Sequence, residues 1–296
     1  AKLPEVYQLP VEKKVGDLDY SKLRTPITPL TKKEMGYCEF DCLVTYYYIV
    51  AELEIYKRVD KLPTTSTGKV RKQLQKLVLN NPTYVHKVSR QINTNPKVYN
   101  MLVDAFAGGY THANYIYADR VIDNVDSYDE TSAYPYVLVT YKFPSTEFKP
   151  CSIKRIEDMS PKFAYLLTVR IKNIRCKYLN NFISSSKCLN IKGYPDYDNG
   201  RIISADEILM TLTDVDLRFI LDTYDYDSYE IEECYSSIYN YLPIEYVDFI
   251  LDKYVLKTKL KNVEGKELEY SREKGAFNSL YGMTVTNTIR ADVNIS

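Results

Sequence analysis

Lys274-Gly275-Ala276-Phe277-Asn278-Ser279-Leu280-Tyr281-Gly282 is the stretch of this chain on which the interpretation of the rest depends. A helix advances about 100° per residue, so Lys274, Asn278 and Tyr281 fall within roughly 60° of arc and span about 10 Å of axis. Tyr270 extends the same stripe toward the N-terminus. A cation, an amide and a phenol are thereby predicted to follow one line, over about the length of a nucleoside triphosphate.

An ordinary amphipathic helix is the alternative for the same residues. Ala276 and Leu280 supply an apolar flank, and Gly282 is a common residue just after a helix end. On this interpretation Asn278 and Ser279 are simply poor helix formers inside the helix.

A second polar segment, Asp129-Glu130-Thr131-Ser132-Ala133-Tyr134-Pro135, follows an alternating run at 121–128 that predicts a strand. Asp129 is then expected at a strand end, with a helix beginning just beyond it. At such a position a carboxylate can hold Mg²⁺, and the first free N–H groups of the helix can receive phosphate oxygens.

Together the two segments resemble motifs A and B of family B DNA polymerases, which read D-x-x-S-x-Y-P and K-x-x-x-N-S-x-Y-G. Both match at every fixed position and in the right order. Chance agreement at about ten positions in a chain of this size is on the order of one in a million.

The resemblance implies a role for each matching residue. Asp129, helped by the carbonyl of Glu130, would bind two Mg²⁺ ions, with Mn²⁺ as a possible substitute, and Lys274 would neutralise the incoming phosphates. The remaining implied nucleotide contacts are Ser132 at the helix start, Tyr134 as the steric gate against ribose, Lys257 as a second cation, and Asn278 and Tyr281 beside the nascent base pair.

Bland interpretations remain open for several of these residues. Tyr134 could be a core residue, Asp129 could be merely solvated like Asp123 and Asp126, and Lys257 could be a surface lysine. The family places a further phosphate lysine one turn before Lys274, where this chain has Tyr270, so either a neighbour such as Lys261 substitutes or that contact is absent.

Phe106-Ala107-Gly108-Gly109 contains adjacent glycines, which let a backbone approach a ligand closely. A plain turn explains the pair equally well. The segment resembles the Y-x-G-G loop that contacts template DNA in this family, with Phe106 in place of the tyrosine. The resemblance implies DNA contacts at Phe106, Gly108, Gly109 and Gly282.

Near the N-terminus, Gly16-Asp17-Leu18-Asp19-Tyr20 and the later Tyr37-x-x-x-Asp41 are similar to the end of the 3′–5′ exonuclease domain of protein-primed family B polymerases. The resemblance implies that Asp41 binds metal and that Tyr37 orients the attacking water. The family also uses a lysine near the first segment. Lys13 and Lys14 lie close to it, although Val15 directly precedes Gly16.

The remaining family motifs are expected outside these residues: two exonuclease carboxylate motifs upstream and Y-x-D-T-D downstream. The chain is therefore interpreted as an excerpt. We expect the segment alone neither to proofread nor to extend a primer.

Bulk composition excludes some classes of protein. Of 296 residues 45% are apolar, which is enough for a sizeable core. The 39 basic residues balance 39 acidic ones, so the net charge gives no indication of nucleic-acid binding. Six cysteines without C-x-x-C spacing and two histidines predict free thiols in a reducing compartment and no zinc site. No membrane span or signal peptide is evident, so we expect an intracellular protein without membrane partners.

The expected fold class is α+β, with an antiparallel fingers hairpin and an incomplete palm short of strands. Long helices are predicted over 31–58, 69–87 and 244–261, and a further helix is expected to begin at Asp214. The expected divisions are the end of an RNase H-like exonuclease domain (1–60), linker and palm start (61–141), an α+β insertion of mixed short strands (142–244), fingers (245–285) and return to the palm (286–296).

The leading hypothesis is part of a replicative DNA polymerase, with primer-template DNA and dNTPs as ligands and a proofreading exonuclease in the full chain. The interval between the motifs is compatible with an insertion that contacts a terminal protein primer. A phage or linear-plasmid source would place a phage enzyme in the cytoplasm of an infected host cell. The alternatives are a conventionally primed polymerase, a non-catalytic DNA-binding or scaffolding remnant, and a stand-alone nuclease, which fails on the missing carboxylates.

Overall fold

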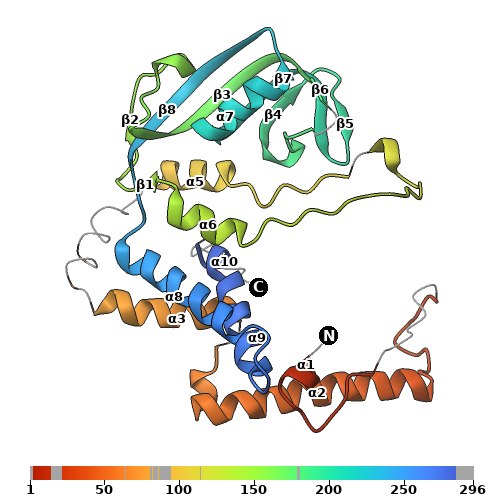
Figure 1. Cartoon of the computed structure of the whole chain (residues 1–296). Helices are drawn as coiled ribbons and strands as arrows, with labels where there is room; N and C mark the ends of the chain where they lie inside the picture. The colour runs from red at the N-terminus through yellow and green to blue at the C-terminus, as the bar shows by residue number, and fades with distance from the viewer. Residues whose placement is uncertain are drawn as a thin grey trace, which may run out of the picture. The chain divides into compact units, whose positions relative to one another are not determined.

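The computed structural model describes residues 3–14, 22–63, 65–80, 82, 86, 95–113, 115–178 and 181–284. The chain divides into two compact units, which are described separately: unit 1 comprises residues 1–80 and 244–296, and unit 2 comprises residues 81–243. Figure 1 labels the elements of both. Helices and antiparallel strands both occur, so the expected α+β class is confirmed.

Unit 2 is built on an antiparallel sheet with the order β1-β8-β3-β6-β4 among its described residues. Three shorter strands join it: β2 pairs with β8, β5 with β6, and β7 with β3. The strands are β1 Phe143–Pro144, β2 Lys149–Pro150, β3 Phe163–Cys176, β4 Cys188–Lys192, β5 Asp196–Asp198, β6 Arg201–Thr213, β7 Tyr224–Asp225 and β8 Ser228–Asn240.

The three central strands are longer than the short strands expected from the sequence. β3 has 14 residues, and β6 and β8 have 13 each. In β3 the buried residues run continuously from Ala164 to Val169 instead of alternating. This pattern hides the period of two by which a half-buried strand is recognised, because both faces of the strand are covered.

Helices cover both faces of β3. Leu167 lies in the main core with Leu217 and Ile220 of α7 (Asp214–Thr223). The neighbouring Leu166 points the other way and packs on α5 (Pro96–Ala105). Figure 1 shows both helices beside the sheet. The expected helix start at Asp214 is confirmed.

The sheet also closes the insertion on itself. β1 is the first strand after α6 (Ala133–Thr140) and pairs with the end of β8, with Phe143 opposite Asn240. Residues 144–239, which make up most of unit 2, thus begin and end next to two residues that are paired in the sheet.

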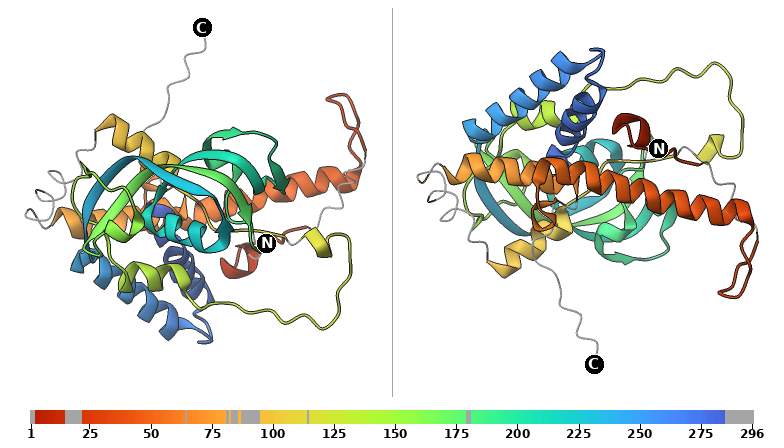
Figure 2. Two further views of the ribbon diagram at one scale, coloured as in Figure 1. Left: turned by 90° about the horizontal axis from the view of Figure 1, so that it is seen from above. Right: turned by 90° about the horizontal axis from the view of Figure 1, so that it is seen from below.

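Unit 1 contains the long helix expected at 31–58, which is confirmed as α2 (Lys32–Tyr56) and is uninterrupted in Figure 2. Thr31 caps it, because the Thr31 hydroxyl accepts a hydrogen bond from the Glu34 N–H while the Glu34 carboxylate accepts from the Thr31 N–H. Lys57, in the left-handed region at φ 62°, ends it. Two smaller helices are α1 (Leu3–Val6) and α3 (Ser66–Leu79); Lys87, the expected end of the latter, lies outside the described residues.

The hairpin expected after residue 244 consists of α8 (Ile244–Leu260) and α9 (Glu267–Asn278), followed by α10 (Leu280–Thr284). The apolar spacing of Val247, Ile250, Leu251 and Tyr254 in the first helix predicts that these four side chains face inward, and this prediction is partly wrong. Ile250 is buried, but Leu251 and Tyr254 are 45% and 42% exposed. Lys253 is buried instead, because it pairs with Glu273 of α9. Residues 286–296, the expected return to the palm, lie outside the described residues.

The six cysteines are free thiols, as expected, and Cys38 and Cys42 are exposed on α2. Within the described ranges, no helix combines the length and apolar character needed to cross a bilayer.

Candidate functional site

The segment before Asp129 is not the strand that its alternation predicted. Residues 121–130 are exposed and irregular. A strand needs a partner for its backbone groups, and among the described residues none pairs with this segment. The expectation of a helix just beyond Asp129 is confirmed, since α6 begins at Ala133 after Ser132, whose φ is 60°.

The carboxylates of Asp129 and Glu130 are both exposed. In the described part of the chain, no three His, Cys, Asp or Glu side chains gather into a metal-binding group. Asp129 and the Glu130 carbonyl suit one Mg²⁺ shared with substrate oxygens, since Mg²⁺ usually takes one or two carboxylates plus phosphates. They do not amount to ligands for two ions.

The glycine loop contacts the tyrosine of motif A. A Cβ added to Gly109 would lie 2.8 Å from the Tyr134 hydroxyl, whereas one added to Gly108 would meet nothing within 4 Å. The Tyr134 side chain is 49% exposed, so it is not the core residue of the bland interpretation. Phe106 forms the cap at the end of α5 and is 42% exposed. The glycine loop and the motif A tyrosine, which the sequence predicts as separate sites, therefore lie next to each other.

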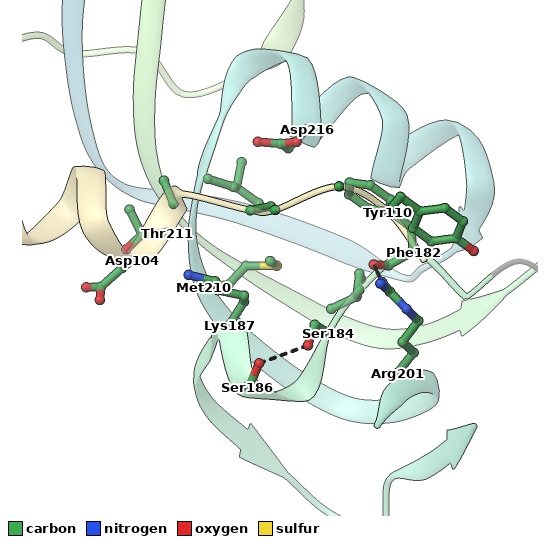
Figure 3. Close-up of a pocket in the computed structure, with 16 residues that line it drawn as sticks. Asp104, Tyr110, Phe182, Ser184, Ser186, Lys187, Arg201, Met210, Thr211 and Asp216 are labelled. Carbon is green, nitrogen blue, oxygen red and sulfur yellow. Dashed lines mark hydrogen bonds between the residues drawn. The ribbon is translucent and has the colours of Figure 1, made fainter. Parts of the chain in front are cut away.

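A pocket of about 250 Å³ lies beside this loop. Figure 3 shows Arg201 next to Tyr110 at one end and Lys187 toward Asp104 at the other. The Arg201 guanidinium lies 4.5 Å from the Tyr110 ring centre and donates hydrogen bonds to the carbonyls of Phe182 and Thr111.

Neither cation of this pocket is among the site residues that the sequence predicts. Arg201 begins β6 and Lys187 precedes β4, each far along the chain from Gly109. Neither residue belongs to a local motif, so no signal within a short window could have found it.

Motif B forms the end of α9 and the start of α10. Lys274 and Asn278 are exposed, while Tyr281 is half-buried. The expected single helix is interrupted at Ser279, whose hydroxyl donates to the Gly275 carbonyl at 2.7 Å. Tyr281 therefore belongs to the second of two short helices, and Gly282 lies in the same short helix.

Lys257 of α8 faces the motif B helix. Its ammonium lies 4.2 Å from the ring centre of Phe277. Burial, and then the positive charges of Lys274 and Lys261, lower the pKa of Lys257. Two lysines that the sequence placed 17 positions apart are thus near enough to repel each other, which is a favourable arrangement for a polyanion.

The exonuclease-like residues lie on α2. Tyr37 and Asp41 are half-buried one turn apart, and the Lys13 ammonium lies 3.6 Å from the Asp41 carboxylate. Lys14 lies over the Phe40 ring at 3.8 Å. The segment Gly16 to Tyr20 lies outside the described residues.

Asp129 belongs to unit 2 and Lys274 to unit 1, so each motif is placed within its own unit. The family model for organellar and viral type B DNA polymerases matches residues 6–296. The chain belongs to this family.

Solved structures of Phi29 DNA polymerase share the fold. The orthorhombic crystal form aligns with a TM-score of 0.61 and 19% identity, over 97% of this chain and 46% of that one. The binary complex with primer-template DNA aligns with a TM-score of 0.59 and 20% identity, over 97% of this chain and 46% of that one. The ternary complex with incoming nucleotide aligns with a TM-score of 0.57 and 21% identity, over 95% of this chain and 46% of that one. The chain thus spans just under half of these relatives. No curated protein matches it.

Proposed function

We propose that this chain carries nucleotide- and template-binding residues of a DNA-directed DNA polymerase, which adds dNTPs to a primer. The observation that carries the proposal is the exposed Lys274 on α9 with Lys257 beside it, at a motif that matches in every fixed position. Two nearby ammonium groups suit a triphosphate, whose charge they would neutralise during transfer.

Further contacts extend the nucleotide site. Asn278 is exposed one turn beyond Lys274, and Tyr281 is half-buried in the next helix. We assign both to the nascent base pair and Gly282 to the approach of the template strand. In unit 2, Tyr134 is assigned to the sugar, where a ring would exclude a 2′-hydroxyl, and the N–H groups at Ser132 to phosphate oxygens.

Mg²⁺, or Mn²⁺ in its place, is the proposed cofactor, with Asp129 and the Glu130 carbonyl as ligands. When bound, the ion would polarise phosphate oxygens and lower the charge that the incoming nucleotide presents. The second ion of a two-metal site needs carboxylates beyond those that the structure describes.

Template DNA is proposed to follow the glycine loop and the adjoining pocket. Gly108 and Gly109 line this pocket, and Lys187 and Arg201 place positive charge on it. The partly exposed Phe106 ring is the proposed surface on which an unpaired base stacks.

Proofreading and protein priming complete the proposal for the full enzyme. Tyr37 and Asp41 would serve a 3′–5′ exonuclease, and Lys13 joins them through its ion pair with Asp41. A terminal protein is the proposed primer, and the sheet of unit 2, which lies between the two motifs in sequence, is its proposed contact surface.

Nucleotide binding by the purified chain tests the central claim. A fluorescent dATP analogue is titrated with Mg²⁺ into the chain and into two variants. Lys274→Ala should weaken binding by about tenfold or more, because it removes a charge-assisted hydrogen bond to phosphate. Lys259→Ala, an exposed lysine of α8, is the matched control and should change little. Unchanged affinity in Lys274→Ala would contradict the proposal.

A further inference from the structure

Three consecutive residues of α9 reach in different directions. An Arg272 guanidinium nitrogen lies 3.6 Å from the Glu52 carboxylate of α2. The Glu273 carboxylate accepts a hydrogen bond from Lys253 of α8 at 2.9 Å. The third residue, Lys274, is exposed. Two ion pairs of opposite polarity thus immediately precede the proposed phosphate lysine.

Glu52 is the centre of the first contact and is only 3% exposed. Its carboxylate accepts hydrogen bonds from the Tyr7 hydroxyl at 2.7 Å and the Lys69 ammonium at 2.6 Å. The Arg272 guanidinium also lies 5.0 Å from the Tyr7 ring centre. A buried carboxylate is costly unless it is paired and hydrogen-bonded, and these neighbours satisfy it.

Lys253 is the centre of the second contact and is 8% exposed. Its ammonium lies 5.7 Å from the ring centre of Phe249 as well as bonding Glu273. Buried ion pairs add little net stability, but they specify geometry, because a misplaced partner leaves a buried charge unpaired.

Apolar packing does little to fix the rotation of α9 about its own axis. Phe277, near its end, is its one buried residue. The rotation of α9 about its axis is therefore determined mainly by its charged side chains. Turning the helix by about 100°, one residue, would bring Glu273 toward the Glu52 carboxylate and replace attraction by repulsion.

We propose that Glu52 and Lys253 are positioning residues for Lys274: acting through Arg272 and Glu273, they fix the rotation of the motif B helix and so aim the lysine at the triphosphate. This inference rests on the proposed function. It concerns how Lys274 is oriented, whereas the proposed function concerns whether Lys274 binds phosphate.

The test compares how tightly the chain binds a fluorescent dATP analogue and the corresponding monophosphate. A well-aimed Lys274 favours the triphosphate, so the ratio of the two affinities reports its orientation, whereas general loosening would weaken both ligands alike. Glu273→Gln should lower the ratio by about fivefold or more, through loss of a charge-assisted contact. Glu269→Gln breaks an exposed pair between α9 and Lys266, the residue that precedes this helix, and should leave the ratio unchanged.

Two further variants separate positioning from stability. Lys253→Met combined with Glu273→Leu removes the buried ammonium together with its partly buried partner, and should restore the melting temperature while the ratio stays low. Glu273→Gln added to Lys274→Ala should lower the ratio no further, because the lysine through which it acts is gone.

A normal ratio in Glu273→Gln, recovery of the ratio together with stability in the double variant, or an equal further loss on the Lys274→Ala background would each overturn the positioning role. If Lys274→Ala itself keeps the ratio of the unmodified chain, both the proposed function and the positioning role fail. A loss of the ratio in Lys274→Ala but not in Glu273→Gln removes the positioning role alone.

Discussion

The hydroxyl of Tyr134 occupies the space that a side chain at position 109 would need. This contact gives the second glycine of the loop a reason independent of turn conformation, because its backbone is not in the left-handed region. The lack of a side chain at Gly109 thus leaves room for the Tyr134 hydroxyl in its observed position.

Gly109→Ala should therefore displace the Tyr134 ring. If that ring excludes ribose, the polymerase carrying this segment should discriminate less well between dNTPs and rNTPs, measured as the ratio of their incorporation rates. Gly108→Ala is the control, since its added Cβ meets nothing within 4 Å. Equal discrimination in both variants would separate Gly109 from sugar selection.

Lys257 supplies a prediction about pH. Lys274→Ala should raise the pKa of Lys257 toward its ordinary value of 10.5, because a neighbouring like charge is removed. Lys261→Ala should raise the pKa of Lys257 less, because Lys261 has a smaller effect on it than Lys274 has. The pKa of Lys257 is lower in the folded chain than in the unfolded chain, so the unfolded chain binds this proton more tightly. The free energy of unfolding therefore increases as pH rises from the folded pKa of Lys257 toward 10.5. NMR titration of ¹³C-methylated lysines measures both shifts, and an unmoved Lys257 would show that Lys274 lies too far away.

Among the elements, helices were predicted better than strands, for a physical reason. A helix makes its backbone hydrogen bonds locally, and its first turn is often marked in the sequence by a capping residue, as at Thr31 and Thr213. A strand depends on a distant partner, so the alternation at 121–128 was misleading while the long β3 was underestimated. The division into five subdomains stays a prediction.

The candidate site divides in the same way. Lys274, Asn278 and the Asp129 segment were found because their spacing is local. Arg201 is brought to the glycine loop by the sheet, and Glu52 is brought to Arg272 across 220 positions of sequence. Contacts of this kind leave no periodic trace in one sequence, so only the folded chain reveals them.

The cap of α7 is open to a stability test. The Thr213 hydroxyl accepts from the Asp216 N–H and donates to its carboxylate at 2.7 Å. Thr213→Ala should lower the free energy of unfolding of unit 2 by about 1 kcal/mol in urea denaturation. Thr140→Ala, whose hydroxyl only bonds back to Tyr136 within α6, should stay within about 0.5 kcal/mol of the unmodified chain. A cost no larger at Thr213 would mean that the cap contributes nothing measurable.

At the scale of the whole molecule, the two units differ in how the chain builds them. Unit 2 is one continuous segment and contains the main core, whereas unit 1 joins two segments that lie on either side of it in sequence. Continuity and a complete core are the requirements for folding alone.

Residues 95–243 expressed alone should therefore fold, with a cooperative thermal transition and a near-ultraviolet circular dichroism signal from packed tyrosines. Residues 22–80 alone should show neither, because α3 then lacks the helices on which it packs. A broad, non-cooperative melt of 95–243 would show that unit 2 needs the rest of the chain.

The pairing of Phe143 with Asn240 has a consequence for how members of this family diversify. Opposed residues in antiparallel strands lie about 5 Å apart, a gap that a two-residue turn can close. Natural variation can therefore enlarge, shrink or exchange the material between these two positions without re-spacing what lies on either side. The same junction offers protein engineers a place to transplant this region between relatives.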